Sequence, residues 1–119
     1  AQSPAMLESI KAGRPVPVEE KDTLADSLLG GIGKENHYTL PLVQKHVDEH
    51  VVITEPEIET AMTYAYVQHS LVIEGASAVG IAALQSGKVE AAGKKIAAVV
   101  SGSSVDPVKF LRVLQKHVK

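Results

Sequence analysis

With 119 residues, the chain is the size of one domain. Its formal net charge of −2, with 12 basic and 14 acidic residues interspersed, argues against a nucleic-acid-binding surface, which would need a basic patch. The chain has no cysteine, which excludes a disulfide framework and thiolate chemistry, and no apolar run approaches the ~18 residues of a membrane helix. We therefore expect a cytoplasmic protein that binds neither nucleic acid nor membrane.

The apolar residues are mostly small aliphatic ones, since Trp is absent and the chain has one Phe. Small side chains allow close packing but bury little area per contact. We therefore expect a core that is shared with more protein than this chain contains.

The N-terminal third predicts a short helix followed by irregular segments. Residues 3–13 place apolar side chains at helical spacing, with Ser3 as a cap and Gly13 as a stop. Residues 22–33 begin as a capped turn and end in glycines. That pattern is typical of backbone that approaches a ligand closely, or of a surface loop.

The middle of the chain predicts a helix over residues 38–47 and a strand over residues 51–53. Thr54 and Glu57 then have the spacing of a capping box, which opens a helix to about residue 70. Its buried face should carry Ile58, Ala61, Met62 and Ala65.

The last third predicts helix, strand and helix. Residues 75–87 are small and apolar around most of the helix girth, which indicates burial. Residues 96–100 form a short apolar run that is typical of a strand buried on both faces. Asp106 and Pro107 then mark the start of a final helix, whose inward side chains should be Phe110, Leu111 and Leu114. The alternation of strands and helices predicts an α/β fold with a parallel sheet.

A ligand site is expected in the loop 101–104, because open α/β sheets bind ligands beyond the carboxyl ends of their strands. The loop amides could bind an anion, a loop hydroxyl could meet a ring nitrogen, or the loop could be a solvated turn. Glu74 precedes the buried helix and is either an N-cap carboxylate or a site residue, and the two roles are compatible. The five histidines lack ligand spacing, so no metal site is expected.

Three motifs in order resemble pyridoxal-phosphate enzymes of the tryptophan-synthase-β class, the threonine and serine dehydratase and serine racemase family. Thr23-Leu24-Ala25-Asp26-Ser27 is similar to T-[IL]-A-D-G of that class. Leu71-Val72-Ile73-Glu74-Gly75-Ala76-Ser77-Ala78 is similar to V-E-P/G-A-G/S-A, and Val99-Val100-Ser101-Gly102-Ser103-Ser104-Val105-Asp106 to V-L-S-G-G-N-x-D. Ser27 and Glu74-Gly75 look closest to the threonine-dehydratase-like enzymes of ectoine and hydroxyectoine utilisation.

The resemblance implies an incomplete part of an open parallel sheet flanked by helices, the large cofactor domain of a fold-type-II enzyme. It also implies pyridoxal 5'-phosphate as the cofactor. Ser101 would supply a hydroxyl to the pyridine nitrogen, with Gly102 beside it. Glu74 would lie near the ring, and Ser27 near the ring edge or the substrate.

The resemblance further implies that residues 1–119 are the C-terminal portion of a dehydratase catalytic domain. The Schiff-base lysine and the phosphate loop would lie outside this chain, so no catalytic residue is expected within it. The intact enzyme would convert a small hydroxy amino acid or an ectoine-derived amino acid to a 2-oxo acid and ammonia, as a homodimer. This chain alone would be inactive without the N-terminal part. The alternatives are an amino-acid racemase of the same family and a stand-alone α/β module that binds phosphate or nucleotide.

Overall fold

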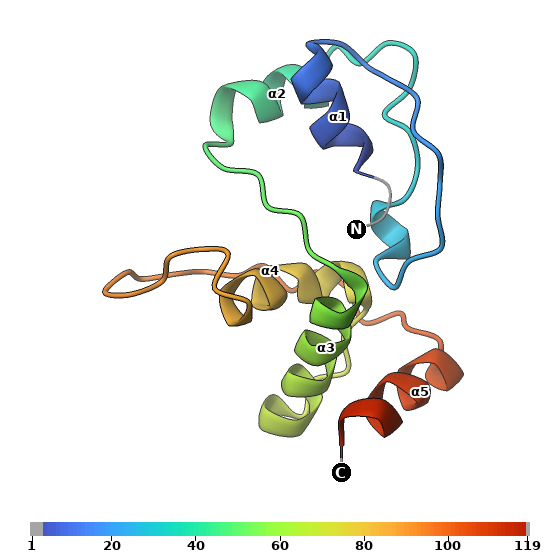
Figure 1. Ribbon diagram of the computed structural model, residues 1–119, viewed down its shortest axis with the longest axis vertical. Helices are drawn as coiled ribbons and strands as arrows, with labels where there is room; N and C mark the ends of the chain where they lie inside the picture. The colour runs from blue at the N-terminus through green and yellow to red at the C-terminus, as the bar shows by residue number, and fades with distance from the viewer. Residues whose placement is uncertain (1–3, 119) are drawn as a thin grey trace.

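The computed structural model describes residues 4–118, and the helices in that range fall into two groups (Figure 1). Helices α1 and α2 lie together at one end of the molecule, while α3, α4 and α5 pack together at the other. The short 3-10 helix η1 lies on the connection between α1 and α2 and contacts α4. The elements in chain order are α1 (Ala5–Ala12), η1 (Asp26–Leu28), α2 (Thr39–His46), α3 (Glu55–His69), α4 (Gly75–Gln85) and α5 (Pro107–His117).

Three helix ends follow the predicted capping residues, namely the C-terminus of α1 and the N-termini of α3 and α5. Helix α1 ends at Gly13, whose φ of 68° is left-handed and favours glycine, whereas the predicted cap Ser3 lies outside the described residues. Helix α3 begins with the predicted capping box, in which the backbone N–H of Thr54 donates to Glu57 Oε2 at 2.7 Å. At the start of α5, Asp106 Oδ1 accepts backbone hydrogen bonds from residues 108 and 109 at 2.7 and 2.9 Å.

The core lies where α3 packs against α4 and α5. All four side chains predicted for the inner face of α3 are buried, and they meet Ala78 and Ala82 of α4. Helix α5 adds Phe110 and Val113 to this core. The prediction that Leu111 faces inward was wrong, because Leu111 is 56% exposed and Val113 takes the inner position.

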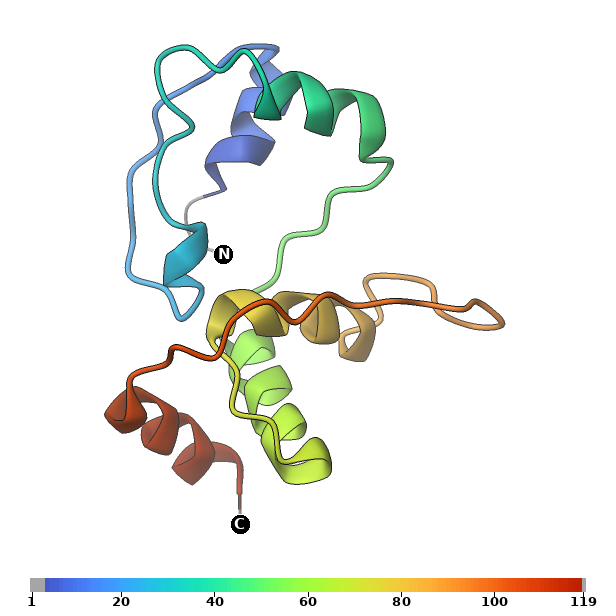
Figure 2. The ribbon, with the colours of Figure 1, turned by 180° about the vertical axis from the view of Figure 1, so that it is seen from behind.

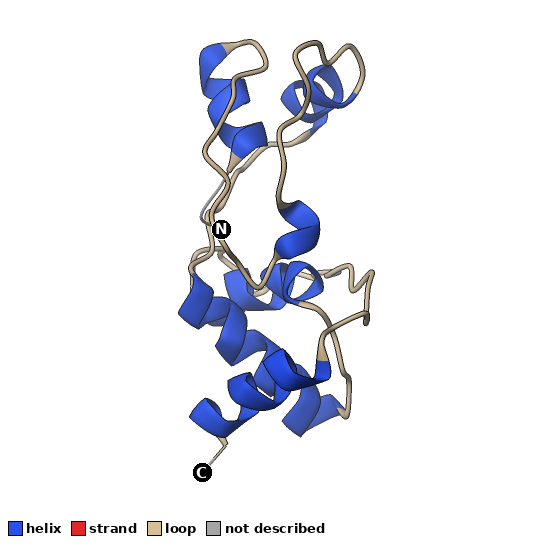
Figure 3. Cartoon of the chain, turned by 90° about the vertical axis from the view of Figure 1, so that its right-hand side faces the viewer, coloured by secondary structure: helices blue, strands red, loops and turns tan. Residues whose placement is uncertain are grey.

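The predicted strands do not pair in this chain. No strand forms among residues 4–118, as Figure 3 shows, and residues 51–53 and 96–100 are extended connections. The expected burial of residues 96–100 on both faces was also wrong, since Val99 is 82% exposed. A strand of this kind needs neighbouring strands and two covering layers, which residues 4–118 do not supply. The parallel sheet therefore stays a prediction.

The extended segment 96–104 runs along α4 instead (Figure 2). Gly80 faces it, and a β-carbon there would lie 3.5 Å from Ala98 Cβ. The radius of gyration is 15.2 Å, compared with about 13.5 Å for a compact chain of this length. This open shape agrees with a core that needs more protein. None of the helices described here is both long and apolar enough to cross a bilayer.

Candidate functional site

The three motifs meet at the N-terminus of α4. The backbone of Leu24 passes directly over Gly75, so closely that a β-carbon on Gly75 would lie 2.2 Å from the Leu24 carbonyl oxygen. A side chain at position 75 would therefore force the backbone of Leu24 to shift. The third motif reaches the same place from the other direction, because the backbone N–H of Glu74 donates to the carbonyl of Gly102 at 3.2 Å.

The structure brings the predicted site residues Ser27, Glu74 and Gly102 together. Ser27 Oγ donates to Glu74 Oε1 at 3.2 Å, which joins the first motif to the second. Gly102 packs against the Glu74 carboxyl group, and a β-carbon on Gly102 would lie 2.4 Å from Glu74 Cδ. Glu74 caps α4 through its backbone carbonyl, which accepts hydrogen bonds from the N–H groups of residues 77 and 78. Its carboxylate makes no cap bond, so the side chain is directed to Ser27 and the N-cap carboxylate reading was wrong.

Ser101, the fourth predicted residue, lies beside Ser77. The two hydroxyl oxygens are 3.4 Å apart, and the backbone N–H of Gly102 donates to Ser77 Oγ at 2.7 Å. Ser77 is buried, with 2% of its surface exposed, whereas Ser101 is exposed. Sequence reasoning missed Ser77 because a small residue in a helix of small residues looks like packing. The available signal was a hydroxyl on a buried helix, which needs partners.

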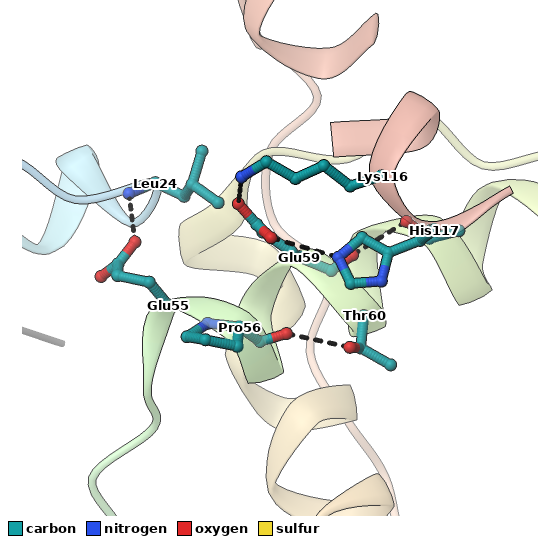
Figure 4. Close-up of polar contacts among 8 residues, drawn as sticks. Leu24, Glu55, Pro56, Glu59, Thr60, Lys116 and His117 are labelled. Carbon is teal, nitrogen blue, oxygen red and sulfur yellow. Dashed lines mark hydrogen bonds and ion pairs between the residues drawn. The ribbon is translucent and has the colours of Figure 1, made fainter. Parts of the chain in front are cut away.

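Glu55, also missed, holds the first motif in place. Its carboxylate accepts a hydrogen bond from Thr23 Oγ1. It accepts another from the Leu24 N–H at 2.8 Å, which Figure 4 shows. The Thr23 hydroxyl in turn accepts from the N–H of Ala25 at 3.2 Å. Charge-assisted hydrogen bonds of this type are about twice as strong as neutral ones. Glu55 therefore fixes the loop whose carbonyl covers Gly75.

Glu59, one helical turn after Glu55 on α3, holds α5 through its carboxylate. Glu59 contacts Lys116 Nζ at 2.6 Å and His117 Nε2 at 3.1 Å (Figure 4). Burial acts to raise the pKa of Glu59, but these two hydrogen bonds outweigh burial and leave the pKa below its usual value. These contacts join α3 to α5, and Glu59 and Lys116 line a shallow hollow of about 390 Å³ together with Thr23 and Leu24 of the first motif.

The residues described do not enclose a ligand-sized pocket at the N-terminus of α4. A cavity of about 40 Å³ lies among Asp26, Glu74 and Ser104, far smaller than the 300–1,000 Å³ that ligand pockets usually occupy. A larger hollow of about 750 Å³ lies between α1 and residues 47–53, is lined mainly by apolar side chains, and holds none of the predicted site residues. Within residues 4–118, no three His, Asp or Glu side chains gather closely enough to bind a metal ion.

Comparison with known proteins decides the family. Residues 1–102 match the family model described as "Pyridoxal-phosphate dependent enzyme". The chain belongs to this family. The family depends on pyridoxal phosphate, which confirms the cofactor expected from the resemblance.

The names of the matched relatives are those of dehydratases, ammonia-lyases and racemases. The chain is 47% identical, over 86% of its length, to a Sinorhizobium fredii protein named provisionally as a threonine dehydratase. It is 41% identical, over 95% of its length, to the L-threonine ammonia-lyase of Thermotoga maritima. The solved structure of maize serine racemase matches 98% of the chain with a TM-score of 0.77 and 26% identity.

The chain spans about a third of these proteins, namely 31% of the first, 27% of the second and 36% of the third. Residues 103–119, which contain α5, lie beyond the part that the family model matches. The predicted link to ectoine utilisation is not among these findings and stays a prediction.

Proposed function

We propose that this chain is the C-terminal portion of the catalytic domain of a pyridoxal-phosphate-dependent lyase. The intact enzyme would eliminate the α-hydrogen and the β-hydroxyl group of a small hydroxy amino acid as water, and hydrolysis of the resulting enamine would yield a 2-oxo acid and ammonia. The observation that carries the proposal is the meeting of the three motifs at the N-terminus of α4, where Ser27 contacts Glu74 and Glu74 contacts Gly102. The named activities of the dehydratase and ammonia-lyase relatives support the choice of reaction.

The residues present fit the ring end of the cofactor. Ser101 offers an exposed hydroxyl next to the site, and a hydroxyl can donate a hydrogen bond to a pyridine nitrogen without protonating it. When bound, pyridoxal phosphate supplies the electron sink for the reacting amino acid. In this proposal Ser101 and Gly102 border the ring nitrogen, Glu74 lies near the ring, and Ser27 orients the Glu74 carboxylate.

The lysine that bonds the cofactor and the loop that binds its phosphate are assigned to protein outside this chain. The proposal therefore makes the 119-residue chain inactive by itself. We further propose that the intact enzyme is a cytoplasmic homodimer.

The test compares the whole enzyme with its Ser101→Ala variant and uses Ser86→Ala as the control. Ser86 lies at the exposed end of α4, where its hydroxyl donates to the carbonyl of Ala83 at 3.3 Å. We expect Ser101→Ala to weaken pyridoxal-phosphate binding, followed by absorbance, about tenfold, the equivalent of one lost hydrogen bond. Ser86→Ala should bind normally. Unchanged binding in Ser101→Ala, or turnover of L-threonine or L-serine by the 119-residue chain alone, would refute the proposal.

Racemisation is the second candidate, because the match to maize serine racemase extends over 98% of the chain. The products separate the two reactions. Elimination releases a 2-oxo acid and ammonia, whereas racemisation converts the L-amino acid to its D-form without loss of nitrogen. A diamino acid derived from ectoine, tested beside threonine and serine, would decide the finer substrate proposal, and equal or better turnover of the diamino acid would support it.

A further inference from the structure

We propose that Ser77 is a positioning residue that sets the direction of the Ser101 hydroxyl, so that Ser101 donates its hydrogen to a ligand rather than to the protein. The proposal rests on the proposed function, because it concerns the same cofactor contact. It assigns a role to a residue of α4 that lies behind the site and does not face the ligand.

The direction follows from the partners of Ser77. A serine hydroxyl has one hydrogen to donate and two lone pairs to accept with. The N–H of Gly102 can only donate, and it occupies one lone pair of Ser77 Oγ at 2.7 Å. Ser77 is 2% exposed, so water cannot readily accept its hydroxyl hydrogen. A buried hydroxyl hydrogen without an acceptor costs free energy. Ser101 Oγ, 3.4 Å away, can accept it.

Once Ser101 accepts from Ser77, its own hydrogen is left for another partner. Ser101 is exposed, so that hydrogen can be donated to a partner that approaches from outside α4. The 3.4 Å separation is long for a hydroxyl pair, whose usual distance is about 2.8 Å, and it lets Ser101 adjust toward an incoming acceptor. The chemistry that fits is a neutral aromatic nitrogen, which accepts a hydrogen bond and has no proton to give. The pyridine nitrogen of pyridoxal phosphate is such a group.

The experiment is a double-mutant cycle in the whole enzyme. The apoprotein of the wild type, Ser77→Ala, Ser101→Ala and the double variant is titrated with pyridoxal phosphate, and the dissociation constant is read from the absorbance of the bound cofactor. If Ser77 acts through Ser101, Ser77→Ala alone should weaken binding about three- to tenfold. In the Ser101→Ala background, Ser77→Ala should change binding less than about twofold.

A purely structural role for Ser77 predicts a different result. Loss of the Gly102 contact would then shift the loop whether or not Ser101 is present, so the two effects would multiply. Ser77→Cys keeps the shape of the side chain but donates weakly, and it should weaken binding with an unchanged melting temperature of the apoprotein. Multiplying effects, or normal binding by both Ser77 variants, would overturn the proposal.

The cycle also separates failure of this inference from failure of the proposed function. If Ser101→Ala itself binds the cofactor normally, the proposed contact is wrong and the role of Ser77 falls with it. If Ser101→Ala binds weakly while Ser77→Ala binds normally, the cofactor contact stands and only the role of Ser77 is refuted.

Discussion

The carbonyl oxygen of Leu24 occupies the place where a β-carbon on Gly75 would lie, at a distance of 2.2 Å. This contact joins the first motif to the start of α4, and it requires glycine at position 75. It explains why these two short segments, some fifty residues apart in sequence, form one surface.

Replacing Gly75 or Gly80 of α4 with alanine should change the free energy of unfolding in opposite directions. In Gly75→Ala the new methyl group collides with backbone, which cannot rotate away as a side chain can, so we expect a loss of about 3 kcal/mol in the free energy of unfolding. Gly80→Ala meets only an ordinary contact at 3.5 Å. It should gain up to about 1 kcal/mol from helix propensity. Urea unfolding of the purified proteins measures both values, and equal shifts in the same direction would contradict the structure.

Gly102→Ala should damage the site more than the fold. The atoms that a new β-carbon would meet belong to the end of the flexible Glu74 side chain, which can move aside. Its movement breaks the contact with Ser27, so cofactor binding by the whole enzyme should weaken about tenfold. The melting temperature should change by less than about 2 °C. A large drop in melting temperature with normal cofactor binding would show that position 102 serves stability.

Removal of the Glu55 carboxylate should release the first motif. In Glu55→Ala the Thr23 hydroxyl and the Leu24 N–H lose a charged acceptor, and we expect a cost of about 2 kcal/mol. Hydrogen exchange reports the change directly, since the Leu24 amide should exchange at least tenfold faster. Glu59→Ala is the matched control, because Glu59 lies on the same helix but contacts α5. Unchanged protection of Leu24 in Glu55→Ala would show that the loop is held by other contacts.

Stability should fall in acid partly through Glu57. The hydrogen bond from Lys88 and that from the Thr54 N–H lower the pKa of Glu57 from 4.5 to about 2. Because the pKa is lower in the folded state, Glu57 stabilises the protein fully above about pH 4.5, and this contribution is lost as the pH falls toward 2.

Glu57→Gln tests this contribution, because the amide can still accept from Thr54 but has no charge for Lys88. The gap in unfolding midpoint between wild type and Glu57→Gln should be widest near pH 7 and should close near pH 2. A gap of constant width would exclude a role for the charge. Asp106 reinforces the acid sensitivity, because backbone hydrogen bonds from Lys109 and Val108 lower its pKa also.

The helices could be predicted from the sequence because their signals are local. The capping box at Thr54 and Glu57 and the cap at Asp106 involve neighbours three residues apart or closer, and the structure contains both. The burial of residues 96–100 could not be predicted for this chain in the same way. Apolar residues show what a segment could bury, whereas actual burial depends on partners elsewhere in the fold.

The sequence predicted those site residues that lie within the three motifs. Ser27, Glu74, Gly102 and Ser101 all lie around the N-terminus of α4, although their contacts with the cofactor remain a proposal. Glu55 and Ser77 were missed, since each has an ordinary local explanation as a first-turn carboxylate and a small helix residue. Their bonding partners lie 24 to 32 residues away in sequence, and only the folded chain reveals such pairs.

The exposed stretch 96–100 has a practical consequence for anyone who prepares this chain by itself. Its backbone is extended and, in the part of the chain described, makes no ladder with another strand, while Val99 and Val100 face outward. Such an unprotected edge is a template for another copy of the same stretch. The isolated chain should therefore self-associate as its concentration rises, and Val99→Lys should keep it in solution by placing a charge on that edge.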